Sequence, residues 1–234
     1  VVGICGCTAL ILAGFGLKDS ISKIMDYQYV DIYDYDMLIA LKNTLTGEEI
    51  TSTINNLKEK EEIDKIIPIY MSSETAKYEE FEEETQIFVI DSSDTLKEVV
   101  RLKDLKTGEE LKLNDDEVII TDKLSQLLGV KVGDEIILQD TDDNEYKVKI
   151  GAITEHYISH YIYMTDNLYK KIHSEDVTAN VLLAKYKTNL DENAENNLSK
   201  DILNDSKIAS ITLTTNLMNT MNDTLSAMNL VVYI

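Results

Sequence analysis

The sequence predicts an α+β fold of two lobes. Three observations support this prediction: helical and extended patterns alternate through the middle of the chain, 44% of the 234 residues are hydrophobic with 28% charged, and the chain contains one proline and nine glycines. Such proportions are typical of a folded protein and exclude a disordered tail or a collagen-like fibre. The scarcity of proline and glycine leaves no room for a long linker, so we expect one compact body.

The charge balance argues against a nucleic-acid partner. Lysine and arginine number 22 against 43 aspartates and glutamates, which gives a formal net charge of −21. A surface of this sign repels phosphate backbones. The two cysteines, Cys5 and Cys7, are too close in sequence to cross-link the body of the protein, so folding must depend on the hydrophobic core.

Both ends of the sequence are apolar. Residues 1–17 carry no charge, and residues 225–234 become more apolar toward Ile234. A bilayer-spanning helix needs about 20 such residues. A signal peptide would require an initiating methionine and a basic leader, which do not precede this run. We interpret the two ends as the last part of one transmembrane helix and the start of another.

Beside each apolar end, hydrophobic residues recur at helical spacing. This periodicity indicates one apolar face on each of two helices. We predict that the two faces pack together as an antiparallel stalk and couple the membrane helices to the lobes. The alternative is that ordinary amphipathic helices dock on the globular core. The predicted coupling residues are Leu17, Ile21, Ile24, Leu217, Met221, Leu225 and Met228.

Local patterns predict the elements of the first lobe. The alternation in Tyr27–Leu41 predicts a half-buried strand, and the spacing in Thr46–Glu62 predicts a surface helix. A strand follows over Ile63–Ser72, where Pro68 must lie at an edge or a bulge because proline cannot donate to the ladder. Gln86–Ile90 predicts another short strand.

The second half of the chain gives stronger local signals. Val118–Asp134 predicts a strand, a short helix capped by Thr121 or Asp122, and a turn with Gly129 in the left-handed conformation. The polar run between Glu135–Gln139 and Tyr146–Ile150 predicts a hairpin turn. Beyond these, residues 191–204 read as a capped helix and residues 208–212 as the next strand.

Candidate metal-binding patterns are weak. The six glutamates within residues 74–84 predict a solvated face. Asp140, Asp142 and Asn144 have the first spacings of a calcium loop, but the required glycine and final glutamate are missing. His156 and His160 would point to one side of a strand. They lack an evident third zinc ligand, although the distant His173 could approach in space.

No motif of a catalyst is present. The sequence lacks a nucleophile elbow, a phosphate-binding loop and the H-E-x-x-H zinc motif. We therefore assign no catalytic, cofactor-binding or metal-binding residue and expect that the protein is not an enzyme. A metal-dependent hydrolase that uses His156 and His160 remains the third-ranked alternative.

Four segments, in order, resemble a known family. They are TALILAGFGLKDSISKI (Thr8–Ile24), TDKLSQLLGVKVGDEI (Thr121–Ile136), HYISHYIYMTDNLYKKI (His156–Ile172) and MNTMNDTLSAMNLVVYI (Met218–Ile234). They are similar to segments of FtsX-like permeases of Gram-positive ABC transporters. The resemblance implies an extracellular domain between two membrane helices. In the related MacB-type permeases, a mixed two-lobed extracytoplasmic domain receives ATP-driven motion from inside by mechanotransmission.

The resemblance also implies an organisation and partners. We expect a membrane-helix end and stalk over residues 1–26, a first lobe over 27–94, a second, β-rich lobe over 95–176, a return over 177–214, and a second stalk over 215–234. The implied partners are a separate ABC ATPase subunit, the cell membrane, an unknown extracellular ligand or protein, and a second copy in a dimeric transporter. The alternative function is a membrane-anchored module that binds an extracellular peptide, lipoprotein or cell-wall enzyme.

Overall fold

The computed structural model describes residues 20–232. Its elements include a π-helix, η1, over Tyr27–Ile32. The strands are β1 (Met37–Leu41), β2 (Ile63–Tyr78), β3 (Phe81–Ile90), β4 (Val118–Thr121), β5 (Glu135–Gln139), β6 (Glu145–Thr154), β7 (Tyr161–Thr165), β8 (Val181–Tyr186) and β9 (Ile208–Leu213). The α-helices are α2 (Gly47–Lys58), α3 (Ser93–Leu96), α4 (Asp122–Leu128), α5 (Asp166–His173), α6 (Glu192–Leu203) and α7 (Thr214–Val232).

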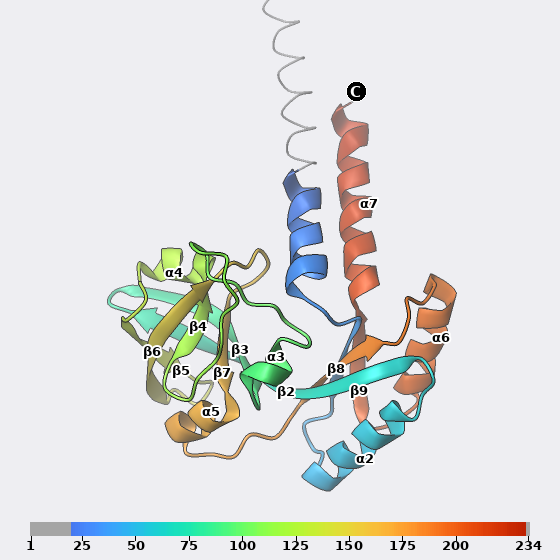
Figure 1. Ribbon diagram of the computed structural model, residues 1–234, viewed down its shortest axis with the longest axis horizontal. Coiled ribbons are helices and arrows are strands. Elements are labelled where there is room, and N and C mark those ends of the chain that lie inside the picture. The colour runs from blue at the N-terminus through green and yellow to red at the C-terminus, as the bar shows by residue number, and fades with distance from the viewer. Residues whose placement is uncertain (1–19, 233–234) are drawn as a thin grey trace, which may run out of the picture.

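The strands form two lobes that share one strand. Their order is β3-β7-β4-β6-β5-β2-β8-β1-β9, and β2 also pairs with β3. The second pairing closes the strands from β3 to β2 into a barrel, whereas β8, β1 and β9 extend from β2 as an open sheet (Figure 1). The predicted mixed α+β, two-lobed class is confirmed.

The open-sheet lobe is an antiparallel sheet covered by two helices. Side chains of α2 and α6 pack with those of β1, β8 and β9 in one buried cluster. Thr46 begins α2 with a capping box, in which its hydroxyl accepts from the Glu49 amide and the Glu49 carboxylate accepts from the Thr46 amide. Asp191 caps α6 by accepting from the Ala194 amide at 2.8 Å. These caps satisfy amides that a helix leaves free, and the helices and strand predicted here are confirmed.

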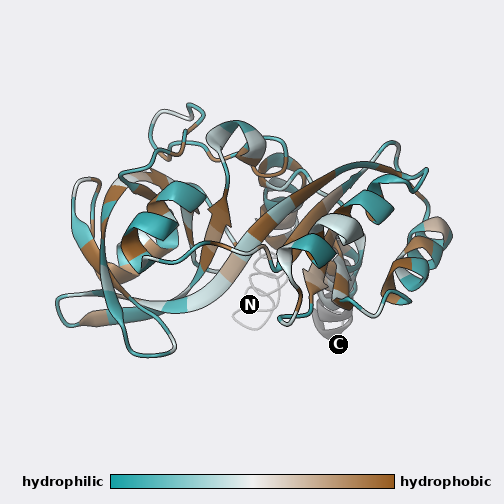
Figure 2. Ribbon diagram, turned by 90° about the horizontal axis from the view of Figure 1, so that it is seen from below, coloured by the Kyte–Doolittle hydropathy of each residue, from teal (hydrophilic) through white to brown (hydrophobic). Residues whose placement is uncertain are grey.

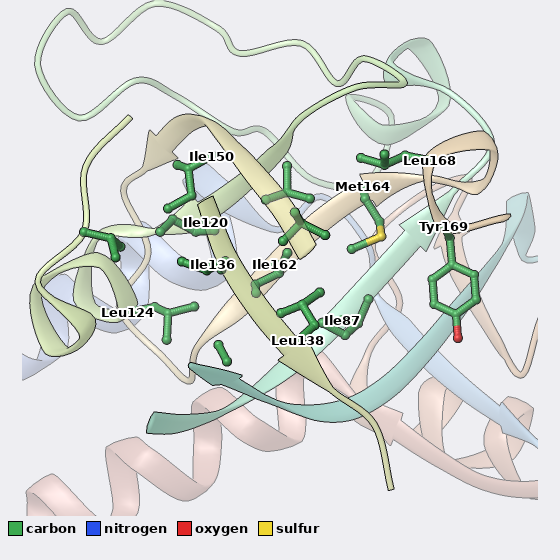
Figure 3. Close-up of a cluster of buried hydrophobic side chains, with 14 of the residues drawn as sticks. Ile87, Ile120, Leu124, Ile136, Leu138, Ile150, Ile162, Met164, Leu168 and Tyr169 are labelled. Carbon is green, nitrogen blue, oxygen red and sulfur yellow. The ribbon is translucent and has the colours of Figure 1, made fainter. Parts of the chain in front are cut away.

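The barrel lobe encloses its own apolar core (Figure 3). Ile87, Ile120, Ile136 and Ile150 all point inside and are fully buried. The ring includes two parallel pairs, β3 with β7 and β4 with β6. The predicted succession of β4, α4 and turn is confirmed, and Gly129 ends α4 with a φ of 72°. The predicted cap was wrong in one respect, because Thr121 precedes α4 without a side-chain hydrogen bond to it. The hairpin of β5 and β6 is confirmed as well, with Asp140 accepting from the turn amides of Asp142 and Asn144.

The boundary between the lobes falls inside β2. Residues Ile63–Ile69 of β2 pair with β8, and residues Tyr70–Tyr78 pair with β3. The structure thus has β3 in the barrel, whereas the predicted division grouped residues 27–94 in the first lobe. The 16-residue length of β2 explains the difference, because one strand serves both lobes. Pro68 lies where β2 pairs with β8 alone, at an edge as predicted.

The prediction of a strand over Tyr27–Leu41 was wrong for its first half. Residues 20–26 are helical and η1 continues them to Ile32, so that β1 begins only at Met37. Gln28 and Ile32, four positions apart, are the buried residues of η1. This spacing places both side chains on one face of a helix. The alternation of tyrosine with aspartate has the period of a strand, which led to the wrong prediction.

Two further expectations need correction. His156 and His160 lie in the loop between β6 and β7 and not on a strand, and Ser159 in that loop has a left-handed φ of 62°. His156 is 3% exposed. In the acidic run 74–84, Glu74 is buried at 4% exposure because it belongs to the long strand β2.

The helical residues 20–26 and α7 leave the junction of the lobes on the same side. Figure 1 shows both helices rising on that side, and Figure 2 shows the barrel and the open sheet at opposite ends of the molecule. Among the described residues, no helix is both long and apolar enough to cross a lipid bilayer. Leu17 lies outside the described residues.

Candidate functional site

The candidate site is the base of the two terminal helices, where the predicted coupling residues lead into the lobes. Ile21 and Ile24 are half-buried, and the adjacent Met25 is buried at 5% exposure. On α7, Met221 is half-buried, whereas Leu217 is 41% exposed. Leu225 and Met228 belong to α7, but their side chains lie outside the description. Direct packing of the apolar face of the first helix on that of α7 stays a prediction.

Below these residues, Gln28 joins the N-terminal helical segment to the barrel lobe. Its side chain is fully buried. Gln28 Nε2 donates to His156 Nε2 at 3.0 Å, and Gln28 Oε1 accepts from the Tyr157 amide at 2.9 Å. Both partners belong to the loop between β6 and β7. Gln28 thus ties the first helix to a loop more than 120 positions away in sequence, with donors and acceptors matched.

His156 is the centre of this polar network. The Tyr33 hydroxyl also contacts His156 Nε2, at 3.2 Å. Burial lowers the pKa of His156 to about 4, so the ring is neutral at pH 7 and its Nε2 can accept a hydrogen bond. Since Gln28 donates to this nitrogen, the ring proton is assigned to Nδ1.

Aromatic rings surround the network. The rings of Tyr33 and His156 lie 5.6 Å apart, and those of His156 and Tyr161 lie 4.9 Å apart. At the surface, Tyr27 stacks on Tyr157 with centroids 5.9 Å apart. Each contact joins the segment around η1 to the β6–β7 region of the barrel, or lies within that region. Ring pairs of this kind add to the area that they bury.

The start of α7 is fixed to the same segment from the other side. The Thr214 amide donates to the Asp36 carbonyl at 3.0 Å, and the Thr214 hydroxyl donates to the Tyr35 carbonyl at 3.0 Å. The Thr215 hydroxyl donates to Glu195 Oε2 on α6 at 2.6 Å. Both terminal helices therefore meet at residues 28–36, which comprise most of η1 and its link to β1. The first helix runs directly into this stretch, and α7 is hydrogen-bonded to its last two residues.

Gln28, Tyr33 and His156 were not predicted from the sequence as members of one network. One signal was available: Gln28 continues the helical spacing of Ile21 and Ile24 into the tyrosine-rich segment. A polar residue on an otherwise apolar face predicts a buried hydrogen bond. The identity of its partners is a tertiary contact, with 128 positions between Gln28 and His156.

His173 does not join His156 in one site. His156 bonds to Gln28 and Tyr33, whereas His173 packs between Tyr146 and Tyr169, with ring centroids 3.9 and 4.0 Å away. Within residues 20–232, no group of three or more histidine, cysteine, aspartate or glutamate side chains is placed to hold a metal ion.

Comparisons with known proteins give structural relatives only. No protein-family model matches the chain, and no curated protein matches its sequence. The periplasmic region of MacB from Actinobacillus actinomycetemcomitans is similar in structure, with 15% identity, 82% of this chain and 94% of that chain covered, and a TM-score of 0.47. The extracellular domain of the noncanonic ABC-type transporter YknZ from Gram-positive bacteria has 15% identity, with 76% and 98% covered and a TM-score of 0.46.

A third solved structure is a domain of a putative permease protein from Porphyromonas gingivalis. It is 9% identical, with 75% of this chain and 79% of that chain covered and a TM-score of 0.37. These similarities concern the course of the chain and carry over no functional residue. The structures to which this chain is similar are extracytoplasmic or permease domains.

Proposed function

We propose that the chain is the extracellular domain of an ABC transporter permease and that it transmits motion between membrane helices and its two lobes. The observation that carries the proposal is the common anchor at residues 28–36. Gln28, at its start, is hydrogen-bonded to the loop between β6 and β7, and Tyr35 and Asp36, at its end, accept hydrogen bonds from Thr214 of α7. The four sequence segments that resemble FtsX-like permeases support the same assignment.

The mechanism follows from how the anchor is packed. Ile32 and Tyr33 belong to the buried cluster between the lobes, with Ile69 of β2 and Tyr163 of β7. Close-packed interfaces of this kind shift between discrete arrangements and do not deform smoothly. A tilt or slide of one terminal helix relative to the other must therefore move residues 28–36 and repack the contact between barrel and sheet.

In this proposal the domain is outside the cell and an ABC ATPase acts through the rest of the permease. The predicted coupling residues form the contact between the helices: Leu17, Ile21, Ile24, Leu217, Met221, Leu225 and Met228. Motion would pass from this contact to an extracellular substrate or partner. The chain itself performs no bond chemistry in this role.

The test is uncoupling of the full permease, assembled with its ATPase in nanodiscs. The double variant Ile21→Asp, Met221→Asp introduces two charges on the predicted contact. We expect basal ATP hydrolysis to persist while its stimulation by transport is lost. The control Asn219→Asp, Thr220→Asp adds the same charge at two exposed positions of α7 and should retain stimulation. Equal stimulation in both double variants contradicts the proposal.

A further inference from the structure

A cavity of about 440 Å³ opens beside the anchor of the terminal helices. It lies between the segment of residues 29–36, the end of β8, the region of α6 and the first turn of α7. This volume lies in the range of small-molecule pockets and leaves ample room for a small amine. Its lining includes Tyr29, Tyr35, Asp36, Tyr186, Glu195 and Met218.

The lining is acidic and aromatic. Asp34, Asp36 and Glu195 contribute carboxyl groups, and no lysine, arginine or histidine is among the described residues that line the cavity. Asp34 is neutralised from outside by Arg101 and by Lys185, whose Nζ lies 2.5 Å from Asp34 Oδ1. Within residues 20–232, no salt bridge reaches Asp36 or Glu195. Neither carboxylate therefore forms an ion pair at the cavity, although the charge of Lys185 acts on Asp36 from a greater distance and favours its ionised form.

Among the described residues, each of these two carboxylates accepts a hydrogen bond on only one of its two oxygens. Asp36 Oδ2 accepts from the Tyr186 amide at 2.7 Å, and Glu195 Oε2 accepts from the Thr215 hydroxyl at 2.6 Å. Among the described contacts, no hydrogen bond reaches Asp36 Oδ1 or Glu195 Oε1. Burial raises the pKa of both carboxyl groups, as expected where a charge lacks compensation. Glu195 itself is 4% exposed.

Tyr186 supplies an independent sign that a group is missing. The residue is 7% exposed, and its buried hydroxyl has no hydrogen-bond partner among the described residues. Buried polar atoms are nearly always paired, with protein, water or a ligand. The hydroxyl lies within electrostatic reach of both Glu195 and Asp36. An ammonium or guanidinium group has donors for all three, and the faces of Tyr29 and Tyr35 favour a cation.

We propose that this cavity binds a small organic cation, namely a primary ammonium or guanidinium group carried on a short apolar chain. The cation is placed between Asp36 and Glu195, and its chain packs against the tyrosine rings and Met218. Because the lining includes both residues 29–36 and the start of α7, an occupied site joins the two anchored helices to α6. The proposal does not depend on the transport role.

The test uses n-butylammonium as the probe and the full 234-residue chain in non-ionic detergent. Amide chemical shifts and titration calorimetry are recorded at constant ionic strength, with n-butanol as the uncharged counterpart. We expect saturable binding of n-butylammonium with shifts at Tyr29, Tyr35 and Tyr186, and at least tenfold weaker binding of n-butanol. Equal binding of the two probes, or no saturable binding, overturns the proposal.

Two variants separate the site from the general acidity of the chain. Glu195→Gln retains an acceptor for Thr215 and should weaken n-butylammonium at least fivefold. Glu192→Gln makes the same change at an exposed position of the same helix and should alter affinity less than twofold. Tyr29→Leu, at a half-buried position, should weaken binding while the fold persists. Equal losses in Glu195→Gln and Glu192→Gln contradict the proposal.

A further arm distinguishes a free amine from a lysine side chain of a partner protein. N-acetyl-lysine methylamide carries the same ammonium group with a peptide backbone attached. Tighter binding than n-butylammonium indicates a protein side chain as the occupant, and weaker binding indicates a free amine. Each result supports a cation site, whereas absence of binding by both probes overturns it.

Discussion

Gln28 and His156 are 128 positions apart in sequence, yet their side chains meet at 3.0 Å in the buried junction between the first helix and the barrel. The contact is one of three that fix Gln28, Tyr33 and the β6–β7 loop to one another. Its consequence is that the helix cannot turn about its own axis without breaking hydrogen bonds in the core.

Replacing Gln28 by leucine should destabilise the protein. The change keeps the volume similar but leaves the part-buried Tyr157 amide without its acceptor and removes one of the two groups that contact His156 Nε2. An unsatisfied buried polar group costs about 1–3 kcal/mol, so the free energy of unfolding in urea should fall by about that amount. Gln126→Leu, at an exposed position of α4, should change it by less than about 0.5 kcal/mol. Similar losses in both variants would refute the structural role of Gln28.

His156 should make stability fall in acid. Its pKa is lowered by burial from 6.5 to about 4, so between these values the unfolded chain binds more protons than the folded one. Stability is therefore fully present above about pH 6.5 and declines as the pH drops to about 4. We expect the stability difference between the parent and His156→Gln to shrink by up to about 3 kcal/mol over this range. Parallel urea-midpoint curves for the two proteins would contradict this assignment.

Glu74 should have the opposite effect. Burial, followed by the charge of Asp140, raises the pKa of this carboxyl to about 7. The folded protein then binds more protons than the unfolded chain between pH 4.5 and 7, so the contribution is present below pH 4.5 and is lost as the pH rises through about 7.

The variant Glu74→Gln should consequently stabilise the protein at pH 8 by up to about 3 kcal/mol and change little at pH 4.5. His173 Nε2 lies 3.8 Å from Glu74 Oε1, and the ring of Tyr146 covers His173. Burial lowers the pKa of His173, so at pH 8 this ring is neutral and does not offset the charge of Glu74. Glu84→Gln, at an exposed position of β3, is the control. A pH-independent effect of Glu74→Gln would rule out the buried charge as its cause.

Thr214→Val should loosen the start of α7. The substitution preserves the shape of the side chain and removes the hydrogen bond from its hydroxyl to the Tyr35 carbonyl, which measures 3.0 Å. The expected loss in thermal or urea stability is about 1 kcal/mol. Thr212→Val, at an exposed position of β9, should be neutral because valine suits a strand. Under the proposed function, Thr214→Val in the full permease should also reduce transport-stimulated ATP hydrolysis more than Thr212→Val does.

The sequence predicted best where local chemistry decides the structure. Thr46, Asp191 and Gly129 mark the ends of helices by caps and by a left-handed turn, and the run after Gln139 contains the Asx turn of a hairpin. Pro68 marks an edge because its missing amide proton excludes it from a central ladder.

It failed where distant contacts decide. The alternation in Tyr27–Leu41 suits a strand, but burial of Gln28 against His156 and of Ile32 between the lobes stabilises a π-helix there. Closure of the barrel depends on parallel pairings such as Gln86 with Tyr161, which leave no local signature. Of the candidate site, only the apolar helix faces were predicted. Its polar partners lie in the loop between β6 and β7, and no pattern in the sequence links that loop to the first helix.

The shared strand β2 limits how the lobes can move. Its residues up to Ile69 pair with β8, and its residues from Tyr70 onward pair with β3. A free hinge between the lobes would therefore require main-chain hydrogen bonds to break. The relative motion that breaks the fewest hydrogen bonds is a change in the twist and bend of β2 as a whole. Displacement of either lobe is thereby delivered to the other through covalent backbone, without a flexible joint in which it could be dissipated.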